Sequence, residues 1–138
     1  MTMKAKDVEI FHPAVAVVGR VMFTLIFFLS GITHFTNLHD YVALMPAAIP
    51  FRAFWVMISA VVELISAALI VTNTYPRLGA WLTVLFLVPV TITVHGVGML
   101  AAPDGQMAGI QTSFFLKGVT MTGAALLITQ LGVRRPEP

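Results

Sequence analysis

The sequence predicts an all-α fold, an antiparallel up-down bundle of four transmembrane helices. Of its 138 residues, 58% are hydrophobic and only 10% are charged. Soluble domains carry about 25% charged residues, because their surfaces face water. The shortage of charge therefore favours lipid as the surrounding solvent. Since this length suits one domain, we expect residues 1–138 to form a single integral membrane domain.

Four apolar stretches make up most of the chain, over residues 14–35, 51–72, 78–101 and 112–131. Each is close to the roughly 20 residues that cross about 30 Å of hydrocarbon. Turn-forming residues separate the stretches at 46–50, 73–76 and 103–105. We expect the first stretch to be a retained helix rather than a cleaved signal, because it is long and contains Arg20.

Basic residues predict the orientation of the four helices. Four spans put both termini on one side, which then carries Lys4, Lys6, Arg77, Arg134 and Arg135, and leaves only Arg52 near the other side. Because lysine and arginine are enriched in cytoplasmic segments, we expect cytoplasmic termini and outward-facing loops at 37–50 and 103–111. The net charge is only +2 and the basic residues are scattered, so nucleic acid is not an expected partner.

One ionisable residue lies inside each predicted span: Arg20, Glu63, His95 and Lys117. A charge at mid-bilayer costs roughly 2.5–3.5 kcal/mol, so such residues normally face the interior of a bundle. Helical spacing places each of them on a face with other polar or small residues. These faces are Arg20, Thr24, Phe27, Gly31 and His34; Arg52, Ser59, Glu63 and Ser66 or Ala67; Arg77, Thr91, His95 and Met99; and Ser113, Lys117, Thr120 and Ala124. Together they predict one polar core.

Depth within the spans indicates how these side chains pair. Glu63 lies near mid-bilayer and Arg20 lies in the cytoplasmic half, where its long side chain covers the offset. We therefore predict an Arg20–Glu63 ion pair, and an outer cluster of His34, His95 and Lys117. The ion pair has a purely structural alternative, in which it only fixes helix register. The cluster is either structural too, or it binds an anionic or quinone-like head group or relays protons.

Pro89 lies inside the third predicted span. A proline within a helix frees the backbone carbonyl one turn earlier. We expect a kink that aims Thr91 and His95 inward.

The histidines also permit two cofactor alternatives. His34, His39 and His95 are a weak metal alternative, because no dense ligand motif occurs and Lys117 would repel a cation. Axial haem ligation by two of these histidines is less favoured than a quinone. The chain has no cysteine, which excludes thiolate sites, and it shows no nucleophile triad or phosphate-binding loop. No catalytic residue is therefore assigned.

Short motifs carry a family resemblance across almost the whole chain. They are Arg20 followed by Ser30-Gly31-Ile32-Thr33-His34-Phe35, then Tyr41, Met45-Pro46, Ile49-Pro50, Glu63, Pro76-Arg77 and Lys117. This arrangement resembles the Gly-x-x-His-Phe branch of the DoxX-like small four-helix membrane proteins, many of which have lysine where this chain has His34. The resemblance implies a bacterial or archaeal cytoplasmic (inner) membrane. It also implies a redox-associated, quinone-linked subunit, accessory to an oxidoreductase rather than a stand-alone enzyme.

Two other functions remain open from the sequence. One is a non-catalytic assembly or chaperone-like subunit, since about 130 residues leave little surface outside the membrane. The other is a small transporter, because intramembrane charges often mark translocation paths. The lack of internal inverted repeats counts against transport. Expected partners are membrane lipid and, in either of the first two functions, other membrane subunits or a second copy of the chain.

Overall fold

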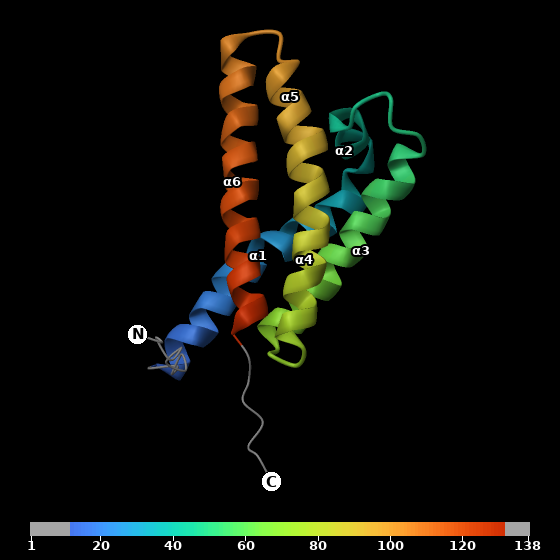
Figure 1. Ribbon diagram of the computed structural model, residues 1–138. Helices are drawn as coiled ribbons and strands as arrows, with labels where there is room; N and C mark the ends of the chain where they lie inside the picture. Colours follow the sequence, from blue (N-terminus) through green and yellow to red (C-terminus); the bar gives the residue numbers. More distant parts are fainter. Residues whose placement is uncertain (1–11, 132–138) are drawn as a thin grey trace.

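The computed structural model describes residues 12–131 and is helical almost throughout that range (Figure 1). The elements are α1 (Pro13–Thr36), α2 (Leu38–Leu44), α3 (Arg52–Val71), α4 (Pro76–Val90), the π-helix η1 (Thr91–Gly96), α5 (Val97–Leu100) and α6 (Gly105–Gln130). Four helical segments are long and apolar enough to cross a membrane: α1, α3, α6 and the continuous run Pro76–Leu100. The predicted fold class is confirmed, and the chain is a multi-pass membrane protein.

The spans follow one another in an up-down order. α1 packs on α3, α3 on α4, and α4 on α6. The start of α1 and the end of α6 lie at the same end of the molecule as the turn between α3 and α4 (Figure 1). α2 lies at the opposite end, where it contacts α1 and α3. The predicted orientation rests mainly on Lys4, Lys6, Arg134 and Arg135, which are outside the described residues.

Small residues set the register between the spans. A buried cluster of Phe27, Ala67 and Leu87 joins α1, α3 and α4. Gly31 lies directly against Ala60 and Leu64. Close approach of backbones at small residues is the usual way in which membrane helices pack. The register therefore places the second half of α1 against the middle of α3.

The inward face predicted for the fourth span is wrong by about one residue. The buried residues of α6 are Gly118, Ala125 and Thr129, whereas Ser113, Lys117 and Thr120 of the predicted face are exposed. One residue turns a helix by about 100°, so the predicted stripe lies beside the true one. Apolar residues are spread around the whole of α6, and periodicity therefore could not select its buried face.

The predicted outer loops are largely helical. α6 begins at Gly105 rather than at residue 112, because the side chain of Asp104 caps it by accepting a hydrogen bond from the backbone N–H of Met107 at 2.8 Å. The loop expected at 37–50 contains the short helix α2. Arg52 lies within 3.4 Å of the carbonyl oxygens of Val42 and Met45 and donates to the end of that helix. The earlier start of α6 and the helix α2 both add ordered structure at the end of the molecule where α2 lies.

A π-helix follows Pro89 in the third span. Proline has no N–H and its ring displaces the carbonyl of the preceding turn, which disturbs the regular ladder. η1 begins two residues later, and the Thr93 hydroxyl donates to the Pro89 carbonyl at 2.8 Å. The wider turn buries Thr91, which is 4% exposed. His95 is half-buried one turn further on.

Replacing Gly79 with alanine is expected to destabilise the protein by about 1–3 kcal/mol. A Cβ atom at this position would lie 2.7 Å from the backbone oxygen of Ser66, which cannot move without shifting α3. The free energy of unfolding, measured by adding SDS to mixed micelles, checks this. Gly123→Ala is the matched control, because nothing lies within 4 Å of its Cβ position. The control is expected to gain up to about 1 kcal/mol from helix propensity, and an equal loss in both variants would contradict the packing.

Candidate functional site within the bundle

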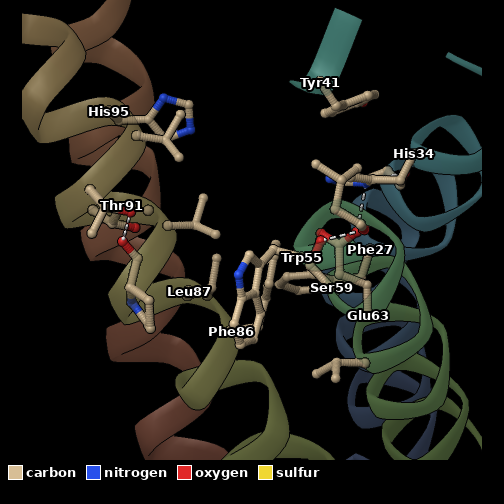
Figure 2. A pocket seen from close by; sticks show the side chains of 18 of the residues that line it. Phe27, His34, Tyr41, Trp55, Ser59, Glu63, Phe86, Leu87, Thr91 and His95 are labelled. Carbon is tan, nitrogen blue, oxygen red and sulfur yellow. Dashed lines mark hydrogen bonds and ion pairs between the residues drawn. The ribbon is translucent and has the colours of Figure 1, made fainter. Parts of the chain in front are cut away.

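A cavity of about 550 Å³ lies between two walls of the bundle. One wall comes from α1, α2 and α3, and the other from α4, η1 and α6 (Figure 2). Most of its lining is aliphatic or aromatic. The polar side chains that line it are Ser30, His34, Tyr41, Ser59, Glu63, Thr91, Thr93, His95 and Lys117. A largely apolar cavity with a few polar groups is the usual form of a small-molecule site.

Glu63 and His34 form an ion pair on the first wall. The His34 Nδ1 atom lies 3.1 Å from the Glu63 Oε2 atom, and the two side chains are 10% and 2% exposed. His34 Nδ1 lies closer still, at 2.7 Å, to the Ser30 carbonyl oxygen, which is the acceptor for its N–H. Glu63 Oε2 therefore accepts no hydrogen bond within the described residues. It is an enclosed carboxylate oxygen, and His34 is its ion-pair partner.

Tyr41 holds the imidazole of His34 in place. Its ring stacks on that of His34 with centroids 3.9 Å apart, and its hydroxyl is 2.7 Å from that of Thr33 (Figure 2). Tyr41 comes from α2, so the short helix at the end of the bundle supplies part of the site. Sequence reasoning used Tyr41 only as part of a motif. Its place four residues into α2, on the face toward α1, would have indicated this contact.

The predicted Arg20–Glu63 ion pair is not formed in the described residues, where Glu63 pairs with His34 instead. The prediction aligned α1 and α3 by their midpoints. In the structure Gly31 lies against Ala60 and Leu64, so Arg20, 11 residues earlier, is about 16 Å further along α1. That register puts Arg20 level with the turn at 72–75. Its side chain does not line the cavity, and its Nε atom is buried without a hydrogen-bond partner in the described residues.

His95 and Lys117 lie on the second wall and are linked through Phe114. The imidazole of His95 stacks on the Phe114 ring with centroids 5.3 Å apart, and its Nδ1 atom is 3.0 Å from the Gln111 side-chain oxygen. The Lys117 ammonium nitrogen is 4.5 Å from the centre of the Phe114 ring, in a cation–π contact. The structure thus brings His95 and Lys117 together, while His34 lies across the cavity from His95 (Figure 2).

Gln111 was missed because the sequence placed it in a loop. It is a helical residue of α6, and its side chain also lies against Gly98 on the neighbouring span. Asp104 before a helix-compatible stretch was the signal that could have found it, since an N-cap there extends the helix across position 111. The contact with Gln111 fixes the ring orientation of His95.

The described residues contain no group of three histidine or acidic side chains that could hold a metal ion. His39 has a side chain that is 97% exposed, and its contact is with the neighbouring Asp40 at 3.5 Å. The metal alternative on His34, His39 and His95 is therefore wrong, because His39 lies on the surface and the other two are on opposite walls.

The cavity is open at its side. Exposed side chains of three spans line it: Trp55 and Ile58 on α3, Leu85 on α4 and Phe114 on α6, which are 51%, 42%, 67% and 40% exposed. Side chains that face both a cavity and the outside of a span mark an opening toward the lipid. A membrane-soluble molecule can therefore reach the polar groups without passing through water.

The fold and the cavity define a class of protein, a four-span membrane protein with a cavity between its helices. Residues 23–128, more than three quarters of the chain, match the family model described as a domain of unknown function, DUF8561. The chain belongs to this family. No curated protein and no solved structure matches this chain.

Proposed function

We propose that the protein binds a quinone-like lipid in this cavity and serves as an accessory subunit of a membrane oxidoreductase. The supporting observation is the cavity itself, which opens toward lipid and carries polar groups on two facing walls. A quinone has an apolar tail that suits a lateral opening and a ring whose oxygens need hydrogen-bond partners. We also propose that the chain is related to the DoxX-like membrane proteins.

The residues of the two walls fit such a ring. The Glu63–His34 pair lines the cavity on the first wall, beside the space for a ring. His95, held by Gln111 through Nδ1, keeps its second ring nitrogen for a ligand. A quinone, when bound, supplies reversible transfer of electrons and protons. The side chains of this chain orient the ring, and the Glu63–His34 pair holds or releases a proton beside it.

The orientation and location are part of the same proposal. Arg77 follows the turn between α3 and α4, at the end where α1 begins and α6 finishes. A basic residue there agrees with cytoplasmic termini in a prokaryotic inner membrane. The cavity then lies toward the outer leaflet, beneath α2.

Binding of a naphthoquinone with an alkyl tail is expected to quench Trp55 fluorescence selectively. Trp55 lines the cavity and Trp81 does not, but the two are almost equally exposed, at 51% and 49%. Quinone dissolved in the micelle would therefore quench both to a similar extent. Trp81→Phe leaves Trp55 as the reporter, and Trp55→Phe leaves Trp81 as the matched control. Saturable quenching of Trp55 alone supports the proposal.

Equal, unsaturable quenching of the two single-tryptophan variants would overturn the quinone proposal. In that case, copurification of the chain with a defined membrane partner would favour the assembly function. A Soret band in the absorption spectrum of the purified protein would instead point to haem between the histidines. Flux through proteoliposomes would favour the transport function.

A further inference from the structure

Lys117 lies deep inside the bilayer. It follows Gly105, the first residue of α6, by 12 residues and precedes Gln130, the last, by 13. At about 1.5 Å per residue, it is roughly 18–20 Å from either end of the helix. A lysine side chain cannot carry its ammonium group that far to reach a head-group region. The charge of Lys117 therefore has to be balanced within the membrane.

No carboxylate of the described residues balances that charge. The ion pairs of residues 12–131 join His34 to Glu63 and His39 to Asp40, and neither includes Lys117. Its recorded contact is the Phe114 ring, which attracts a cation but supplies no negative charge. Lys117 is exposed and lies at the rim of the cavity, so a molecule that enters the cavity from the side can provide the counter-charge.

A second polar group beside Lys117 lacks a partner. Thr91 is 4% exposed, lines the cavity, and its Oγ1 atom has no hydrogen-bond partner in the part of the chain described. That atom lies against Gly118, the residue next to Lys117, so closely that a Cβ atom there would overlap it. The Oγ1 atom is therefore enclosed between η1 and α6 and is not open to the cavity, which leaves Lys117 as the group of this wall that can meet a ligand charge.

We infer that the η1–α6 wall binds an anionic oxygen, so that the ligand of this cavity is an acidic amphiphile. The inference rests on the proposed function, because it names the chemical class of the molecule bound there. Lys117 supplies the charge. The anion lies on this wall rather than on the opposite one, where the Glu63 carboxylate would repel it. For a quinone-like ligand, the acidic group is an ionised ring hydroxyl.

Two matched naphthoquinones test the inference. Both carry an alkyl tail; one has an ionised ring hydroxyl and the other has a methyl group in its place. Binding is followed by quenching of Trp55 in the Trp81→Phe background. The acidic compound is expected to bind at least about tenfold more tightly, as one charge-assisted hydrogen bond predicts. Lys117→Met should remove this preference while leaving the affinity for the neutral compound unchanged, and Lys117→Arg should keep it.

The outcomes separate this inference from the proposed function. If the neutral compound binds as tightly as the acidic one, or Lys117→Met keeps the preference, the anionic site is wrong and quinone binding stands. If a fatty acid binds with the same dependence on Lys117 while neither quinone binds, the anionic site is supported and the quinone class is wrong. If none of the three binds, both fail.

Discussion

Replacing His34 with leucine is expected to destabilise the protein by about 3–5 kcal/mol, because it leaves a buried charge without its partner. Glu63 is 2% exposed and has His34 as its ion-pair partner. Leucine at position 34 provides neither charge nor hydrogen bond, so the carboxylate has to be buried alone or take up a proton. The free energy of unfolding in mixed micelles measures the loss.

The opposite replacement, Glu63→Leu, is expected to cost much less. The N–H of His34 keeps its acceptor, the Ser30 carbonyl oxygen at 2.7 Å, and a neutral imidazole carries no charge to balance. The double variant with leucine at both positions should recover most of the stability lost in His34→Leu, since a well-packed apolar pair can replace a buried ion pair. Equal losses in the two single variants, or additive losses in the double variant, would contradict this pairing.

Replacing Ser59 with phenylalanine is expected to weaken binding of the neutral naphthoquinone at least about tenfold, which corresponds to roughly 1.4 kcal/mol. Ser59 is half-buried and lines the cavity, so a larger side chain occupies the space of the ligand. Its hydroxyl donates to the carbonyl of Val56 in its own helix at 2.8 Å and is not needed between helices. Quenching of Trp55 in the Trp81→Phe background measures the affinity.

Ser113→Phe is the matched control for this variant. Ser113 also lies within a span and donates to a carbonyl of its own helix, that of Gly109 at 2.9 Å. It is exposed on α6 and does not line the cavity. Binding should therefore be unchanged in Ser113→Phe. A similar loss of affinity in both variants would mean that the ligand does not occupy this cavity.

The sequence predicts the spans well because hydrocarbon imposes a strong rule on length and composition. It also identifies the buried faces of the first two spans, since Thr24, Gly31 and His34 on α1 and Glu63 on α3 follow a helical period. The sequence of α6 shows no comparable helical period of polar and small residues on its buried face. In a membrane, the outside of a helix is as apolar as the core, so hydrophobicity does not separate buried faces from exposed ones.

The register between helices was the part of the site that the sequence could not supply. Midpoint alignment paired Arg20 with Glu63, whereas contact at Gly31 brings His34 to Glu63. Steric fit of small residues decides this register, and it is a property of two helices together. Periodicity describes one helix at a time. An alignment of the two helices on Gly31 and Ala60, both small residues, would have predicted the pairing of His34 with Glu63.

The π-helix after Pro89 limits which insertions and deletions the third span can accept. A wide turn holds one residue more than an α-helical turn, so it is the geometric equivalent of an insertion. Removing one residue between Thr91 and Gly96 would restore a regular ladder without turning the helix beyond it, because the wide turn absorbs that residue. Adding one residue before His95 would instead rotate the remaining helix by about 100°. His95 would then leave the wall that it shares with Lys117. The number of residues in this segment, as well as their identity, thus determines the chemistry that the cavity offers.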